Sequence, residues 1–314
     1  MNILLCWVLF VVGIGLVVKG GDLFVDNATS IAHELRIPTF IIGATIVSIA
    51  TTLPEMIVSA FAAAEGKVDM AIGNAVGSVT ANTALILAVA MTAMSFVCKR
   101  RQYMPQMLIL IAVAAILCLS CLGGTMNVFG GIVLFVIFVG FMVLNVINAR
   151  AAGEADEESA PADRKTLIKN IVLFIVGAAG IVIGSRLMVD NGSEIAAWLG
   201  VPERVIAVTM IAVGTSLPEL VTTITAIIKK ESALSVGNII GANIIDLSLI
   251  LPICSLISGQ ALPVPKTSAY IDIPVCLLVT FVGLVPLIIR EKSSRAQGFA
   301  LLGCYAAYLA VTVL

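Results

Sequence analysis

Two short stretches place a proline and a carboxylate inside long apolar segments, ATTLPE at residues 50–55 and GTSLPE at residues 214–219. Proline has no N–H and its ring crowds the carbonyl four positions earlier, so each proline frees backbone carbonyl oxygens from helical hydrogen bonding. The next residue, Glu55 or Glu219, brings a carboxylate to the same depth. Buried carbonyls and carboxylates need partners, and a metal cation can serve as one. The two stretches therefore predict an oxygen-lined cation site where two helices are broken.

A second pair of motifs follows these stretches, GNAVGSVTAN ending at Asn82 and GNIIGANIID ending at Asp246. Glycines four positions apart allow two helix backbones to approach closely. Ser78 precedes Asn82 by four residues, and Ala242 precedes Asp246 by four, so each pair lies on one helical face. The motifs thus add polar side chains, including a third carboxylate, to closely packed helices.

The chemistry of this set is that of oxygen ligands. It combines three carboxylates, an amide, several hydroxyls and freed carbonyls, without His or Cys. Ca²⁺ takes about six to eight oxygen ligands in flexible geometry, whereas softer metals recruit thiolate or imidazole. One buried Glu could serve as a structural hydrogen-bonding group, but two related copies favour a functional pair. A membrane hydrolase would need no second set of freed carbonyls, so we do not expect an enzyme; a channel is a further alternative.

The composition indicates that an integral membrane protein must position these residues. The 314 residues are 60% hydrophobic and 12% charged, whereas a soluble domain is about 45–50% apolar. The net charge of −1 and the 6% aromatic content provide neither the basic surface nor the stacking residues of a nucleic-acid-binding protein. The apolar N-terminus has no basic stretch and no cleavage site, so it predicts a first span rather than a removable signal peptide.

Apolar runs of about 20 residues are long enough to cross a membrane as helices. Polar clusters divide the chain into such runs, which predict an all-α protein of about ten transmembrane helices: residues 2–33, 37–64, 69–96, 104–122, 126–149, 167–198, 203–228, 233–257, 268–289 and 296–313. The loops after odd-numbered spans hold 13 Lys and Arg residues, and the other loops hold 3. Positively charged loops stay in the cytoplasm, so both termini are expected outside it.

The sequence repeats itself with an offset of 164 residues, which places Glu55 on Glu219 and aligns residues 26–87 with the second half without a gap. Because each half holds an odd number of spans, the second half must enter the membrane from the opposite side. This is the inverted-topology repeat of many secondary transporters, whose sites lie near the membrane midplane. The expected domains are an N-terminal repeat of five helices at residues 1–149, an acidic cytoplasmic linker at 150–166 and a C-terminal inverted repeat of five helices at 167–314.

The paired GTSLPE-like and GN-x-x-G-like motifs, in two inverted halves of five spans, resemble those of the sodium/calcium exchangers of the cation/calcium exchanger superfamily. The similarity covers essentially the whole chain and is to the short prokaryotic members, which lack a large regulatory loop. It implies an antiporter of a prokaryotic cell (inner) membrane that exchanges Ca²⁺ for Na⁺. Its partners would be these transported ions and membrane lipid, with no cofactor and no obligatory protein partner.

The resemblance also implies roles for individual residues. Glu55 and Glu219 would be central ligands shared by Ca²⁺ and Na⁺, and the backbone carbonyls of Thr51 and Thr215 would complete the Ca²⁺ site. The flanking Na⁺ sites would draw on the backbone of Ser48 with Thr52 and Ser78 on one side, and on the backbone of Ala212 with Thr215 and Ser216 on the other, while Asn82 and Asp246 would border a middle site.

Three positions depart from the pattern of the family. Ala50 replaces a glycine, Thr52 replaces a serine while keeping the hydroxyl, and Ala242 replaces a serine that helps one Na⁺ site. The Na⁺ stoichiometry is therefore left open. The acidic residue that proton-coupled members tend to carry in the GN motif is absent, which favours Na⁺ and leaves Ca²⁺/H⁺ or other divalent-cation/H⁺ antiport as the alternative.

Spans 1 and 6 are long and rich in glycine, so we expect them to be the pair that moves during transport. Asp22, Asp26 and Asp190 lie toward the ends of these spans and are expected to be solvated at the membrane interface. The 164-residue offset places Arg186 on Asp22, which exchanges a negative for a positive charge.

Overall fold

The structure, a computed structural model, describes residues 3–121, 123–154, 164–201, 214, 216–259 and 261–313. The elements of the first half are α1 (Ile3–Glu34), α2 (Thr39–Ile42), η1 (Gly43–Val47), α3 (Ser48–Ala64), α4 (Val68–Ala81), η2 (Asn82–Leu87), α5 (Ala88–Ala93), α6 (Arg100–Cys121), β1 (Thr125–Met126) and α7 (Val128–Glu154). Those of the second half are α8 (Arg164–Trp198), α11 (Leu217–Ile228), α12 (Ser232–Ile245), η4 (Asp246–Ile250), α13 (Leu251–Ser258), β2 (Leu262–Pro263), η5 (Ser268–Asp272), α14 (Ile273–Arg290) and α15 (Arg295–Val313).

The protein is an all-helical membrane protein built from two inverted repeats of five spans. In the described part of the chain, eight helices are long and apolar enough to cross a membrane. In addition, α15 matches the tenth expected span, and α11 is the described part of the seventh. The largest difference in a boundary is at α7, which ends at Glu154 rather than at residue 149. The rest of the expected linker that precedes α8, residues 155–163, lies outside the described residues.

The helix break expected at Pro54 does not occur: α3 runs from Ser48 to Ala64 with this proline inside it. Proline is tolerated inside transmembrane helices where neighbouring helices and polar side chains satisfy the freed carbonyls. Pro218 differs, since it lies in the first turn of α11, where its missing N–H would have no helical partner. Only the second of the two motifs therefore lies at a helix end.

Wider π-helical turns interrupt several spans. Two of them, η2 and η4, begin at Asn82 and Asp246, which are related by the 164-residue offset. A π turn is an insertion into an α-helix that occurs frequently at functional sites. The two repeats thus become irregular at matching positions, beside the two motifs that end there.

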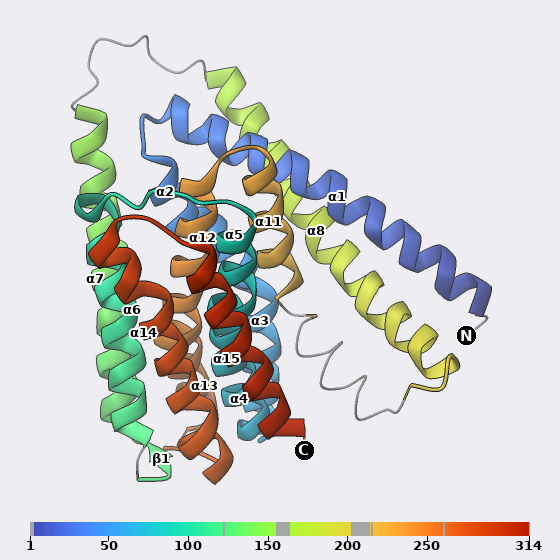
Figure 1. Cartoon of the computed structure of the whole chain (residues 1–314), viewed down its shortest axis with the longest axis vertical. Helices are drawn as coiled ribbons and strands as arrows, with labels where there is room; N and C mark the ends of the chain where they lie inside the picture. Colours follow the sequence, from blue (N-terminus) through green and yellow to red (C-terminus); the bar gives the residue numbers. More distant parts are fainter. Residues whose placement is uncertain are drawn as a thin grey trace.

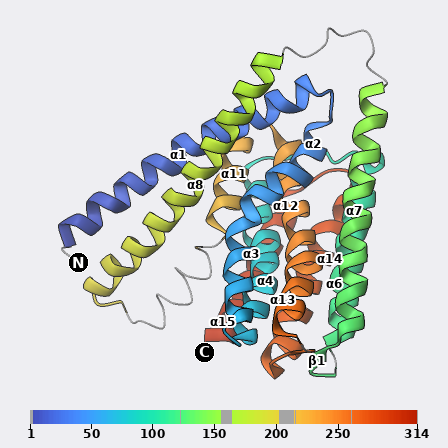
Figure 2. The ribbon, with the colours of Figure 1, turned by 180° about the vertical axis from the view of Figure 1, so that it is seen from behind.

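The helices α1 and α8 lie side by side and antiparallel, and they project away from the bundle formed by the other helices (Figure 1 and Figure 2). Glycines line their contact. A Cβ atom on Gly13 would lie 2.8 Å from the carbonyl oxygen of Gly184, and one on Gly177 would lie 2.6 Å from the backbone nitrogen of Phe24. Because no side chain separates the two backbones at these points, α1 and α8 form one tightly packed unit.

The helix α12 lies inside the bundle, where every residue from Leu234 to Ile245 is buried. It packs against η1 and the start of α3 from the other half. A Cβ on Gly241 would lie 2.6 Å from the carbonyl oxygen of Ala44 and 2.6 Å from the hydroxyl of Ser48. This glycine therefore permits the close helix contact that its spacing predicts. The residues that the 164-residue offset relates to Ala44, within 202–213, lie outside the described residues.

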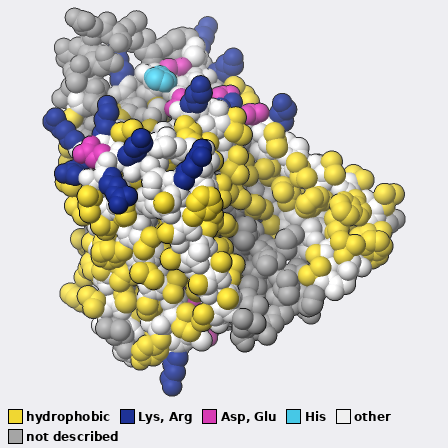
Figure 3. Space-filling model, in the orientation of Figure 1, with side chains coloured by type: hydrophobic (Ala, Val, Ile, Leu, Met, Phe, Trp, Pro, Cys, Tyr) yellow, Lys and Arg dark blue, Asp and Glu magenta, His cyan; other side chains and the backbone are white. Residues whose placement is uncertain are grey.

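The loops after spans 1, 3, 7 and 9, which the structure describes, lie at one end of the molecule, toward the top of Figure 1. The backbone N–H of Cys98 donates to the carbonyl of Glu291 over 2.9 Å, and Val97 pairs with Lys292, which joins the loop after span 3 to the loop after span 9. Figure 3 shows Lys and Arg side chains in a band near this end, above a surface dominated by hydrophobic side chains. The molecule thus has one basic end, as the loop composition predicts.

Candidate ion-binding site

Nine of the eleven residues predicted to bind ions are described by the structure, and each has an exposed fraction of 3% or less. They come from α3, α4, η2, η4 and the start of α11: Ser48, Thr51, Thr52, Glu55, Ser78, Asn82, Ser216, Glu219 and Asp246. The two others, Ala212 and Thr215, lie outside the described residues. The polar residues of both halves are therefore buried in apolar spans, where their oxygen atoms lose contact with water.

α3 carries its polar residues on one face, because Ser48, Thr51, Thr52 and Glu55 follow the three- and four-residue spacing of a helix. This face meets the second repeat. The hydroxyl of Thr52 donates to Oε1 of Glu219 over 3.4 Å, so the two predicted motifs are in contact. The hydroxyl of Thr51 lies 3.1 Å from Oδ1 of Asn238 on α12.

A second contact between the repeats lies at the π turns. The side-chain amide of Asn82 donates to Oδ1 of Asn243 over 3.0 Å. The amide of Asn243 in turn donates to the hydroxyl of Thr83 over 2.8 Å. Asn243 lies in the last turn of α12, three residues before Asp246, where η4 begins. These bonds hold η2 of one repeat against the end of α12 in the other.

Seven buried side-chain oxygens of the predicted site have no hydrogen-bond partner among the described residues: both carboxylate oxygens of Glu55 and Asp246, Oε2 of Glu219, Oδ1 of Asn82 and Oγ of Ser216. Each unsatisfied buried polar group costs about 1–3 kcal/mol, and a charged group costs more. The carboxylate of Glu55 also lies within Coulombic range of those of Glu219 and Asp246. A bound cation would relieve both penalties, because it supplies positive charge and accepts oxygen ligands.

The donor set suits a hard cation held by mixed oxygen ligands. Among the residues that the structure describes, no three His, Cys, Asp or Glu side chains form a compact metal-binding cluster. Hydroxyl, amide and carbonyl oxygens would have to complete the coordination sphere around the carboxylates. Such oxygen ligation is typical of Ca²⁺ and differs from the Cys and His ligation of structural zinc sites.

Four polar residues of the site were not among the predicted ligands: Asn74, Thr83, Asn238 and Asn243. Asn74 donates to the backbone carbonyl of Glu55 over 3.2 Å. Asn74 and Asn238 are the paired asparagines of the two GN motifs, so the 164-residue offset is a signal that could have found both. Asn243 has no such signal, since the offset places it on Val79. Its role depends on the packing of the two repeats.

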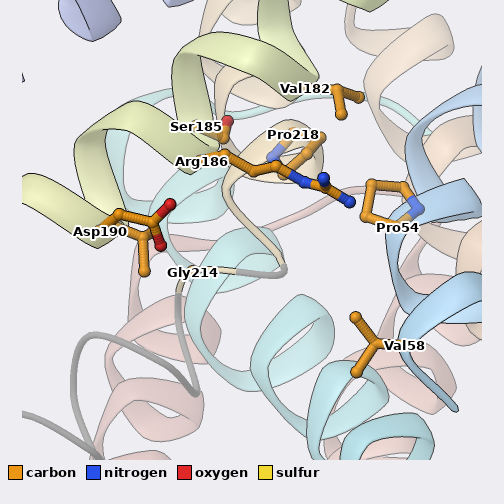
Figure 4. A pocket seen from close by; sticks show the side chains of 9 residues that line it. Pro54, Val58, Val182, Ser185, Arg186, Asp190, Gly214 and Pro218 are labelled. Atoms are coloured by element: carbon orange, nitrogen blue, oxygen red, sulfur yellow. The ribbon is translucent and has the colours of Figure 1, made fainter. Parts of the chain in front are cut away.

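A cavity of about 330 Å³ lies between α8, α3 and the start of α11. Its described lining includes Pro54 and Pro218, the residues that immediately precede Glu55 and Glu219. Figure 4 shows both prolines facing this cavity, with Arg186 extending from α8 toward Pro54. The cavity therefore lies beside both predicted proline motifs.

A buried acidic site between two inverted five-helix repeats, with a cavity beside it, defines an ion-transporting membrane protein. A family model described as "Sodium/calcium exchanger protein" matches residues 5–147 and 169–314. The chain belongs to this family of membrane cation exchangers.

Relatives and solved structures agree with this assignment. The chain is 33% identical over 320 residues to the inner membrane protein YrbG of Escherichia coli, with 98% of this chain and 97% of the relative covered. It is 28% identical to the sodium/calcium exchanger MaX1 of Methanosarcina acetivorans, with 97% of each chain covered. A structure of the sodium-calcium exchanger NCX_Mj superimposes with a TM-score of 0.85 at 27% identity and covers 99% of each chain.

Proposed function

We propose that this protein is a secondary active antiporter that exchanges Ca²⁺ for Na⁺ by alternating access. The observation that carries the proposal is the set of seven buried, unpartnered oxygens contributed by both repeats. Ca²⁺ and Na⁺ are both hard cations that such oxygens can coordinate. The relatives MaX1 and NCX_Mj carry the name sodium/calcium exchanger, which supports the same pair of ions.

The proposed ligands follow from the burial and from the predicted motifs. Glu55 and Glu219 would bind either ion at the centre, with the backbone carbonyls of Thr51 and Thr215 around Ca²⁺. Asn82 and Asp246 would border a middle site at the two π turns. The flanking Na⁺ sites would use the remaining predicted residues, Ser48, Thr52 and Ser78 on one side and Ala212, Thr215 and Ser216 on the other.

The charge of the site suggests a voltage-dependent exchange. If Glu55, Glu219 and Asp246 are all ionised, they supply three negative charges. One Ca²⁺ leaves one of these charges uncompensated, whereas three Na⁺ ions neutralise all three. Each exchange of one Ca²⁺ for three Na⁺ would then move one net charge across the membrane, and an imposed membrane potential would change its rate.

The proposed transport cycle uses the unit formed by α1 and α8 as the moving part. The five-helix repeats at residues 1–149 and 167–314 would act as the two halves of one transporter, joined by the acidic linker. The basic end shown in Figure 3 would face the cytoplasm, which places both termini outside it. The cavity between α8 and α3 would then open toward the outside.

The experiment that tests this function is uptake of ⁴⁵Ca²⁺ into proteoliposomes loaded with Na⁺ and diluted into choline, without a pH gradient. We expect uptake by the native protein that requires internal Na⁺ and is lost in Glu55→Gln and in Glu219→Gln. Glu291→Gln is a matched control, because Glu291 is an exposed loop residue paired with Arg100.

Each other outcome contradicts part of the proposal. Uptake that ignores Na⁺ but follows an imposed pH gradient would replace Na⁺ coupling with proton coupling. Native transport that survives in both Glu55→Gln and Glu219→Gln would refute the assignment of the site. Ca²⁺ movement down its own gradient as single-channel currents would refute the antiport mechanism.

A further inference from the structure

One side of the moving unit is closed by ion pairs between α1 and α11. Lys229, the residue that ends α11, lies 2.8 Å from a carboxylate oxygen of Asp26 and 3.3 Å from one of Asp22. The backbones are also close there, since a Cβ on Gly21 would lie 2.8 Å from the hydroxyl of Thr225. The two aspartates are thus ion-paired, while their side chains stay 45% and 60% exposed.

The symmetry-related contact, between α8 and α3, is open. The offset of 164 places Gly21 on Ser185, and Ser185 lines the cavity of about 330 Å³. Arg186 and Asp190, the counterparts of Asp22 and Asp26, line the same cavity. Figure 4 shows the side chain of Arg186 extending into the cavity toward Pro54. One structure therefore contains the closed and the open form of the same inter-helix contact.

The repeat also exchanges the charges of one pair in this contact, that of Asp22 with Lys229, while Asp26 keeps its negative charge as Asp190. Asp22 becomes Arg186, Lys229 corresponds to Glu65, and Glu231 corresponds to Lys67. The backbone geometry is conserved, because Glu65 and Lys229 end α3 and α11 with the same torsion angles, φ −83° and ψ 2°. In one half, the acid Asp22 on α1 faces the base Lys229 at the end of α11. The corresponding residues of the other half are the base Arg186 on α8 and the acid Glu65 at the end of α3.

The second set of charges is not engaged across the helices in this structure. Glu65 pairs with Lys67 in its own loop at 2.7 Å, with side chains 59% and 64% exposed. Arg186 is exposed and forms no ion pair with another described residue. Both candidate partners are therefore accessible, and Glu65 is held only by a weak exposed ion pair.

We propose that Arg186 and Glu65 form a second ion-pair latch that closes the α3 side after α1 and α8 slide together, while the latch of Lys229 with Asp22 and Asp26 opens. The inference rests on the proposed alternating access. Because α1 and α8 are packed backbone to backbone, bringing α8 onto α3 moves α1 away from α11, so the two latches exclude each other. Exposed ion pairs are weak enough to break in every cycle.

Disulfide trapping tests this latch directly. The variant Arg186→Cys/Glu65→Cys is oxidised in membranes in Na⁺, in Ca²⁺ and in choline, and free thiols are counted by maleimide labelling. The two single-cysteine variants control for the seven native cysteines. We expect a disulfide in the double variant that blocks ⁴⁵Ca²⁺ uptake until it is reduced. A parallel variant, Asp26→Cys/Lys229→Cys, traps the latch seen here, and a variant with all four cysteines should form either disulfide but not both.

Charge reversal provides a second measurement that does not depend on cysteine chemistry. Arg186→Glu and Glu65→Arg should each slow exchange by roughly two- to fivefold, the size expected for an exposed ion pair. The double variant Arg186→Glu/Glu65→Arg should recover the native rate. Glu194→Arg, an exposed position two turns along α8, is the control and should leave the rate unchanged.

Absence of the Arg186–Glu65 disulfide under all three ionic conditions would overturn the latch, as would both disulfides forming in one molecule or no recovery in the charge-reversed pair. Failure of the proposed function gives a different result, because the native protein would then show no Na⁺-dependent uptake. The disulfide pattern requires no transport and would still report whether the two latches exclude each other.

Discussion

Replacing Glu55 by Gln should weaken Ca²⁺ binding more than replacing Glu219 by Gln. Neither carboxylate oxygen of Glu55 has a hydrogen-bond partner in the part of the chain that the structure describes, so both are available to an ion. Oε1 of Glu219 already accepts a hydrogen bond from Thr52, and only Oε2 is unpartnered. A glutamine at position 219 can keep the bond to Thr52 through its carbonyl oxygen. A glutamine at position 55 loses the charge and turns an N–H donor toward the ion.

The magnitude follows from the cost of removing one member of a buried charge pair, about 2–5 kcal/mol. Because about 1.4 kcal/mol corresponds to a factor of ten, Glu55→Gln should raise the half-saturating Ca²⁺ concentration by roughly 30-fold to several thousand-fold. Glu219→Gln loses about one fewer ligand bond, and so its effect should be roughly tenfold smaller.

The assay is the Ca²⁺-dependent rise in the unfolding temperature of the purified protein in choline buffer, since a ligand stabilises the folded state according to its affinity. Without ions, Glu55→Gln should unfold no earlier than the native protein, because it removes a buried charge that lies near two others. This comparison separates lost binding from misfolding. A half-saturating Ca²⁺ concentration within threefold of native, or a larger effect of Glu219→Gln, would refute the reasoning.

Three other perturbations test packing and burial. Gly177→Ala would place a Cβ 2.6 Å from a backbone nitrogen of α1, so it should lower the free energy of unfolding by about 1–3 kcal/mol and slow ⁴⁵Ca²⁺ uptake. The control Gly15→Ala should change neither quantity, because no described atom lies within 4 Å of the new Cβ. Burial raises the pKa of the Cys98 thiol from 9.0 to about 12, so at pH 8 the thiolate fraction of Cys98 in the folded protein should be about a thousandth of that in the unfolded chain. Alkylation of Cys98 should be slower in the folded protein by the same factor, and equal alkylation rates in the two states would contradict this. Asn145→Leu removes the acceptor 3.3 Å from Nε2 of Gln106 and should lower the free energy of unfolding, measured by heating, by about 0.6–2 kcal/mol. The double variant Gln106→Leu/Asn145→Leu should recover most of this loss, whereas additive losses from the two substitutions would show that the hydrogen bond contributes nothing.

The residues of the candidate site are predictable from the sequence mainly where polar or acidic residues occur at matching positions of both repeats. Glu55 and Glu219 appear in matching motifs, and both are 1% exposed in the fold. Asp246 was found in the same way, through its alignment with Asn82. Asn243 was missed because its counterpart is Val79, and its contact with Asn82 joins residues 161 positions apart. The role of Asn243 thus depends on which helices meet.

The sequence by itself determined the class of fold and its symmetry. The lengths of the apolar runs, the odd number of spans per half and the charges of the loops follow from the solvation of single segments by lipid or water, which local composition reports. The offset of 164 residues likewise made the two halves equivalent before any packing was known.

Only the tertiary structure decided how the equivalent halves differ from one another. In the folded protein, α3 continues through Pro54. Lys229 at the end of α11 forms an ion pair with Asp26 of α1, whereas a cavity lies between α8 and α3. The physical reason is that a symmetric sequence permits either side to close. The choice depends on how the packed α1 and α8 unit lies against the bundle, which is a long-range property that no local pattern contains.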